Sequence, residues 1–154
     1  MDDLQRLVAI EDIRRTKTRY WNGMDFNDPA LLRSAFADGA VALDYRGTPD
    51  GPKDGNYFTD ADSCIEWLRT VLGPYVSSHQ GHSVEVDFLS DTHAKATWSF
   101  SDHFWFKGED ESQMLPSLLS QYKSWGHYID EYTKGDGGWR ISATTFRPLH
   151  IERS

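Results

Sequence analysis

Apolar side chains recur at helical spacing through the first twenty residues. They stand at six positions: Leu4, Leu7, Val8, Ile10, Ile13 and Tyr20. The other face carries basic residues, Arg14, Arg15, Lys17 and Arg19. An apolar stripe opposite a charged face predicts an amphipathic helix from Asp3 to Tyr20, and we expect the segment from Trp21 to Phe26 to end it.

Two further helices are predicted from their starting signals. Asn27-Asp28-Pro29 places a capping residue before a proline at the first helical position, which predicts a short helix through Phe36. Thr59 and Asp62 form a capping-box pattern, which predicts a third helix over Asp60–Leu72.

The second half of the chain has the alternation of β-strands. Between Ser83 and Leu89, apolar Val84, Val86 and Phe88 alternate with acidic residues. The predicted strands are Ala40–Tyr45, Ser83–Leu89, Ala94–Phe106, Leu118–Thr133 and Trp139–Pro148, the last four forming a meander. Helices followed by antiparallel strands predict a single α+β domain over residues 1–154, with three N-terminal helices packed on a curved, mostly antiparallel sheet.

Composition and charge narrow the classes of function. The chain has 154 residues, a formal charge of −8 and a pI near 5.1, which argues against binding to nucleic acid or to an anionic membrane. Its one cysteine, Cys64, excludes an internal disulfide and a cysteine-rich zinc site. The first residues lack the apolar run of a secretory signal, and no stretch approaches the roughly 18 apolar residues of a membrane span. We therefore expect a cytoplasmic protein.

The predicted strand from Ala94 to Phe106 has two faces of different chemistry. One face consists of Ala94, Ala96, Trp98, Phe100 and Phe104, and the other of Thr97, Ser99, Ser101, His103 and Trp105. We expect one face to line a pocket and the other to meet a helix, solvent or another subunit. The sequence leaves open which face does which.

Asp25 is of chemical interest because it stands where the first helix ends. The helix dipole disfavours a carboxylate there unless a cation or a hydrogen bond compensates. An imidazole beside Asp25 would supply that compensation. The carboxylate would in turn fix the tautomer of the ring and raise its basicity, as a general base requires.

Four short motifs are spread over nearly the whole chain. They are Gly23-Met24-Asp25, Leu43-Asp44-Tyr45-Arg46, Ser78-His79 and Asp136-Gly137-Gly138-Trp139-Arg140. Their order and spacing resemble those of scytalone dehydratase and its SnoaL-like relatives in the nuclear transport factor 2-like superfamily. The resemblance implies a cone-shaped α+β barrel that encloses a ligand pocket.

The resemblance also implies roles for four residues. In the dehydratase pattern, an aspartate after the first helix supports a histidine that removes the proton α to a ketone, and Asp25 and His79 match these positions. A second histidine, matched by His103, assists the departing hydroxyl, and a tyrosine, matched by Tyr45, polarises the carbonyl. The Asp-His pair is similar to that of hexachlorocyclohexane dehydrochlorinase, which removes a proton and a chloride.

Other positions predict the walls of the pocket. The dehydratase has a second tyrosine where this chain has Met24, and its substrate-gripping asparagine falls at Tyr128, so we expect a substrate other than scytalone. An apolar pocket needs aromatic walls, for which Trp21 and Phe104 are the candidates. We expect a small hydrophobic organic substrate, no cofactor and no metal ion.

Together these features predict a cofactor-independent lyase, in which an Asp-His general base drives a dehydratase-type elimination. Two alternatives stay open: an isomerase or polyketide cyclase that uses the same pocket, and a non-catalytic ligand-binding or assembly subunit. The aromatic strand from Phe100 to Phe106 offers a surface for association, so we expect a homo-oligomer, either a dimer or a trimer.

Overall fold

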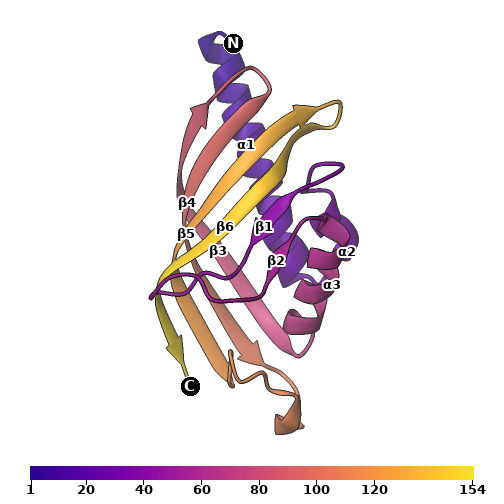
Figure 1. The fold of residues 1–154 in the computed structure, drawn as a ribbon, viewed down its shortest axis with the longest axis vertical. Coiled ribbons are helices and arrows are strands. Elements are labelled where there is room, and N and C mark those ends of the chain that lie inside the picture. The colour runs from indigo at the N-terminus through magenta and orange to yellow at the C-terminus, as the bar shows by residue number, and fades with distance from the viewer.

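Three helices and a curved six-stranded sheet make up the fold (Figure 1). The computed structural model describes residues 1–154. The helices are α1 (Asp3–Asp25), α2 (Pro29–Arg33) and α3 (Ala61–Leu72), with a short 3-10 helix, η1, at Glu111–Gln113. The strands are β1 (Ala42–Asp44), β2 (Tyr57–Phe58), β3 (Tyr75–Phe88), β4 (His93–Phe106), β5 (Gln121–Gly135) and β6 (Gly138–Arg153).

The four long strands pair in sequence order, which confirms the predicted meander. The sheet order is β2-β1-β6-β5-β4-β3, and every pair is antiparallel except β1 with β6. The edge strands β2 and β3 do not pair with each other, so the curved sheet is open rather than a closed barrel. The sequence analysis did not predict β2, because so short a strand shows no alternating pattern.

Helix α1 begins with a capping box at Asp2 and ends at Asp25. The helix ends within the predicted segment Trp21–Phe26, and buried Trp21 and Met24 extend its apolar stripe past Tyr20 by another turn. This last turn carries Asp25 to the sheet.

Two other helix boundaries differ from their predictions. Helix α2 ends at Arg33 rather than Phe36, because Phe36 leaves the helix and forms a β-bridge with Ile141 of β6. Helix α3 is capped by the side chain of Asp60 rather than by Thr59.

Strand β3 starts at Tyr75, well before the predicted start at Ser83. Its first half does not alternate between apolar and polar side chains, because two of its inward-facing residues, Ser77 and His79, are polar. Strand β6 also continues past its predicted end at Pro148.

The helices lie on one side of the sheet and cover the core (Figure 1). Helix α1 contacts β3 and β6, and α3 contacts β2 and β3. The largest fully buried side chains include Trp139, Tyr20, Tyr132, Lys17 and Phe36. Lys17 Nζ lies 2.8 Å from Oδ2 of the equally buried Asp130, so the buried charge has a partner. None of the helices is long and apolar enough to cross a lipid bilayer.

Candidate active site

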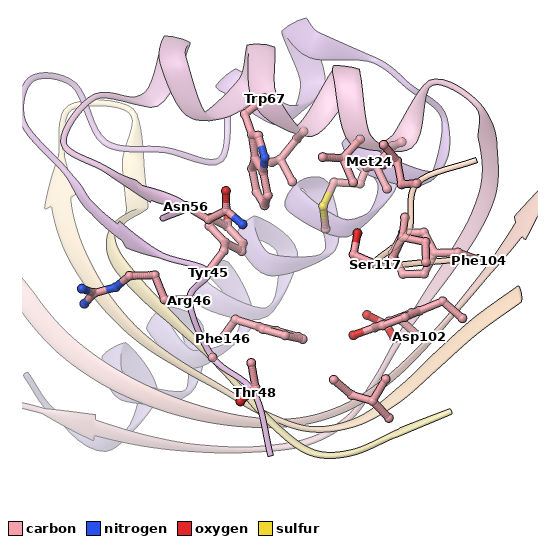
Figure 2. Close-up of a pocket in the computed structure, with 18 of the residues that line it drawn as sticks. Met24, Tyr45, Arg46, Thr48, Asn56, Trp67, Asp102, Phe104, Ser117 and Phe146 are labelled. Atoms are coloured by element: carbon pink, nitrogen blue, oxygen red, sulfur yellow. The ribbon is translucent and has the colours of Figure 1, made fainter. Parts of the chain in front are cut away.

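A cavity of about 530 Å³ lies between the inner face of the sheet, α3 and the loop that follows β1 (Figure 2). Its volume is typical of pockets that bind small organic molecules. The walls are mainly apolar or aromatic and include Met24, Trp67, Leu68, Phe104, Tyr128 and Phe146. His79 and Asp102 are the acid–base groups on the sheet side of this cavity.

Asp25 and His79 form a hydrogen-bonded pair at the cavity. Asp25 Oδ1 lies 2.6 Å from His79 Nδ1. Two more groups of β3 donate to the same carboxylate, Ser77 Oγ to Oδ1 at 2.8 Å and the His79 amide to Oδ2 at 2.9 Å. An ionised carboxylate only accepts hydrogen bonds, so Nδ1 is the donor and the hydrogen of the neutral ring resides there. The pairing therefore leaves the lone pair of His79 on Nε2.

His79 Nε2 has no hydrogen-bond partner within the chain. The His79 side chain is 2% exposed, lines the cavity and packs edge-on against Phe104, with ring centroids 5.3 Å apart. A ring held by a carboxylate and packed in an edge-to-face pair with an aromatic neighbour has little freedom to turn. The arrangement can accept a proton from a molecule in the cavity.

A second carboxyl group, Asp102, lines the same cavity. Its Oδ1 accepts hydrogen bonds from the Ser124 amide at 3.0 Å and the Ser124 hydroxyl at 2.5 Å. Burial raises the pKa of Asp102, an effect that the His79 ring and the Ser124 hydrogen bonds partly offset. The sequence analysis missed Asp102, although strand alternation puts it on the same face as Phe104. No group of three or more His, Cys, Asp or Glu side chains is placed to hold a metal ion.

The apolar face of β4 is the inner one, and His103 lies on the other. Phe100 and Phe104 are buried on the inner face, whereas the His103 ring stacks on exposed Trp105, with ring centroids 3.6 Å apart. His103 does not line the cavity. The prediction of His103 as a catalytic residue in this pocket is therefore wrong, because successive side chains of a strand point to opposite faces.

Tyr45 lines the cavity beside Trp67, with ring centroids 5.2 Å apart. Its hydroxyl lies 2.7 Å from the Tyr20 hydroxyl, and either group can be the donor. Burial raises the pKa of Tyr45 well above its ordinary value. The phenol therefore stays protonated at neutral pH and can donate one hydrogen bond, either to Tyr20 or to a molecule in the cavity.

Three of the four expected wall residues line the cavity: Met24, Phe104 and Tyr128. Trp21 does not, because it is buried against Trp98, with ring centroids 5.5 Å apart, and the prediction for Trp21 is wrong. Lining residues that the sequence analysis missed include Asn56, Trp67, Leu115, Ser117 and Phe146. Most of them lie in α3 and in loops, where no strand alternation assigns a side chain to the cavity.

Comparison with known proteins identifies the family and the fold. The family model of the SnoaL-like domain matches residues 5–145. A proposed scytalone dehydratase from Novosphingobium aromaticivorans is 20% identical, with 97% of this chain and 90% of that chain covered and a TM-score of 0.79. A hexachlorocyclohexane dehydrochlorinase from Novosphingobium barchaimii is 17% identical, with 98% and 93% covered and a TM-score of 0.76.

A proposed dehydratase of the nuclear transport factor 2-like family, from Streptomyces avermitilis, is 12% identical, with 93% of this chain and 98% of that chain covered and a TM-score of 0.72. At such identities the similarity shows the shared fold alone, and it confirms the predicted architecture of three helices on a curved, mostly antiparallel sheet. Because the family model matches most of the chain, the protein belongs to the SnoaL-like domain family, as its motifs predicted.

Proposed function

We propose that this protein is a cofactor-independent lyase that removes a proton and a leaving group from a small hydrophobic molecule. The observation that carries the proposal is the 2.6 Å contact between Asp25 and His79 beside a cavity of about 530 Å³. A histidine oriented by a carboxylate is a general base suited to neutral pH. Two proteins of similar fold are named for eliminations, one a dehydratase and the other a dehydrochlorinase.

The reaction begins when His79 Nε2 takes a proton from a carbon next to a carbonyl group or an activated ring. The carboxylate of Asp25 stabilises the imidazolium that forms, because it already holds the Nδ1 hydrogen. When Tyr20 donates to Tyr45, the Tyr45 hydroxyl hydrogen is free to stabilise an enolate-like oxygen. The leaving group then departs as the new double bond forms.

The lining of the cavity favours a cyclic or polyketide-like substrate with few charges. Phe104, Phe146 and Trp67 supply flat apolar surfaces against which a ring can pack. Arg46 also lines the cavity, but Figure 2 shows its guanidinium directed away from the other lining side chains, and its Nη2 lies 2.8 Å from Asp44 Oδ2. Because the walls are mainly apolar and aromatic, a neutral ketone or halogenated ring is the better fit.

Turnover by three proteins tests this function: wild type, His79→Ala and His103→Ala. With cyclic β-hydroxy ketones or chlorinated rings, the wild type should form a product lighter by water or hydrogen chloride, measured by mass spectrometry. His79→Ala should lower the rate by about 10²–10⁴-fold, the usual effect of a general base. His103→Ala changes a histidine on the outer face and is the matched control, so it should keep the wild-type rate.

Wild-type turnover that survives in His79→Ala would contradict the proposal. A product with the mass of the substrate would instead favour an isomerase or a cyclase that uses the same cavity.

We also propose that copies of the chain associate through the outer face of the sheet. This face exposes Val76, Trp105, Trp125 and Ile129, which are 36% to 51% exposed. Aromatic and aliphatic side chains gathered on one exposed face favour a protein contact. Light scattering should give the mass of a dimer or a trimer, and Trp125→Glu should shift it toward the monomer. A wild-type protein that is monomeric at every concentration would contradict this.

A further inference from the structure

Proton abstraction by His79 leaves the carboxyl group of Asp102 without a role in the proposed reaction. It is 6% exposed and stands on the inner face of β4 between Phe100 and Phe104. Its only hydrogen-bond partners in the chain are the amide and hydroxyl of Ser124. A buried carboxyl group without a cation is unfavourable when ionised, so this position favours the neutral acid.

The two oxygens of Asp102 have different surroundings. Both bonds from Ser124 reach Oδ1, which leaves Oδ2 without a partner in the chain. Asp102 lines the cavity, and Figure 2 shows its carboxyl group on the cavity side of the sheet. His79 is its direct partner across β3 and β4, so the two side chains are neighbours on one face. A molecule that reaches His79 Nε2 therefore also lies near Asp102 Oδ2.

We propose that Asp102 is the general acid of this site and donates the Oδ2 hydrogen to the leaving group while His79 removes the proton from carbon. This inference rests on the proposed function. It supplies a proton donor for the leaving group, a role that His103 cannot take because it does not line the cavity. It specifies the substrate class as one with a poor leaving group, such as a β-hydroxy ketone. A chloride needs no proton to depart, whereas a hydroxide does.

The proposed step is balanced within the site. The C–H bond breaks, its proton goes to His79 Nε2, and its electron pair becomes the new C=C bond. The C–O bond breaks, and the departing hydroxide takes the proton of Asp102 and leaves as water. The site then holds an imidazolium and a carboxylate, and transfer of one proton from His79 to Asp102 restores both groups.

The charges around Asp102 agree with this assignment. Burial is the largest effect on its pKa and raises it, and the carboxylate of Asp25 raises it further. The other ionisable residues that line the cavity are Tyr45, Arg46, Lys53, Asp54, Tyr122, Tyr128 and Arg153, and Asp102 forms no ion pair with any of them. His79 lowers the pKa of Asp102, an effect strongest once the ring has gained its proton. The acid thus becomes a better donor as the base completes its step.

A comparison of leaving groups tests the inference. Asp102→Asn keeps the shape and the acceptor for Ser124 but cannot transfer a proton. With a cyclic β-hydroxy ketone, kcat should fall by about 10²–10⁴-fold at nearly unchanged KM. With the β-chloro ketone of the same ring, the rate above the uncatalysed reaction should be largely retained. His79→Ala should lose both activities, and Asp87→Asn, at an exposed position of β3, is the matched control.

The possible results separate the two proposals. Equal losses for both substrates in Asp102→Asn, or no loss for either, would overturn the role of Asp102 and leave His79 as the base. A wild-type protein that converts neither substrate would contradict the proposed function instead. The protonation of Asp102 is then decided by a measurement that needs no substrate.

That measurement is urea unfolding at a series of pH values. The folded protein keeps the proton of Asp102 at a pH where the unfolded chain has released it, so this residue lowers stability as pH rises above the ordinary aspartate range. Asp102→Asn removes the titration, and its free energy of unfolding should rise relative to wild type from acid to neutral pH. A difference that stays constant with pH would mean that Asp102 is ionised when folded, and would overturn the inference.

Discussion

Among single residues, Asp25 has the most contacts that bear on function. It ends α1, where the helix dipole disfavours its charge, and three hydrogen bonds from Ser77 and His79 of β3 compensate. Because the backbone and the ring of His79 bind the same carboxylate, Asp25 both joins α1 to β3 and orients the imidazole. The Ser77 hydroxyl and the His79 amide need only a hydrogen-bond acceptor, whereas an imidazolium at His79 would need a negative charge.

Asp25→Asn separates these two tasks. The single amide oxygen can keep the bonds at one of the two carboxylate oxygens, so the protein should still fold, as judged by circular dichroism, although the bonds at the other position are lost. Turnover should fall by about 10²-fold or more, because a neutral amide stabilises the charged ring less and permits the wrong tautomer. A kcat equal to that of wild type would mean that the carboxylate charge has no part in the reaction.

At the scale of a residue, the sequence indicates some residues of the candidate site and misses others. The sequence predicts a pairing of Asp25 with His79, because Asp25 stands at a helix end and both residues fit the order of the motifs, and the two side chains lie in hydrogen-bond contact. His103 was predicted from the resemblance, and Asp102 was missed, because the sequence does not say which face of a strand the helices cover. A polar residue among apolar ones on a strand face was the available signal for Asp102.

At the scale of elements, the approach of α1 to β3 sets the distance between the Asp25 carboxylate and the His79 ring. Gly81 permits this approach, because a Cβ at that position would lie 2.2 Å from Cζ3 of buried Trp21. The register of β3 with β4 also shifts between Gly81 and Val84. His79 lies just before this irregularity, so the close packing of helix and strand positions the ring that Asp25 binds.

Gly81→Ala should therefore destabilise the protein. Trp21 cannot move freely because it packs against Trp98, and overpacking of this kind costs roughly 1–3 kcal/mol. Gly135→Ala is the control, since a Cβ there meets no atom within 4 Å, and it should change stability by less than about 0.5 kcal/mol. Urea unfolding measures both, and equal free energies of unfolding for the two variants would refute this account of the packing.

The long elements were predictable from sequence, and their ends were less so. Periodic patterns over many residues indicated α1 and the meander, because burial of one face repeats along each of them, and a capping-box pattern indicated α3. The first half of β3 escaped prediction because Ser77 and His79 face inward but are polar, so the strand does not alternate there. The parallel pairing of β1 with β6 depends on contacts distant in sequence, which no local pattern contains.

At the scale of the whole molecule, the open sheet and its helices provide one cavity with acid–base groups on its sheet side. His79 and Asp102 come from adjacent strands, Asp25 from the end of α1 and Tyr45 from the residue after β1. Their approach needs the complete fold, so the sequence alone could predict the class of fold and the pairing of Asp25 with His79, but not the second carboxyl group.

The most direct test of the central claim, that His79 is a base facing the cavity, is exchange of the α-proton of a cyclic ketone for solvent deuterium. Proton NMR follows this exchange and requires no leaving group. The wild type should exchange faster than solvent alone, and His79→Gln should be slower by about 10²–10⁴-fold, while His103→Gln should match wild type. Exchange at the same rate in wild type and His79→Gln would contradict the account.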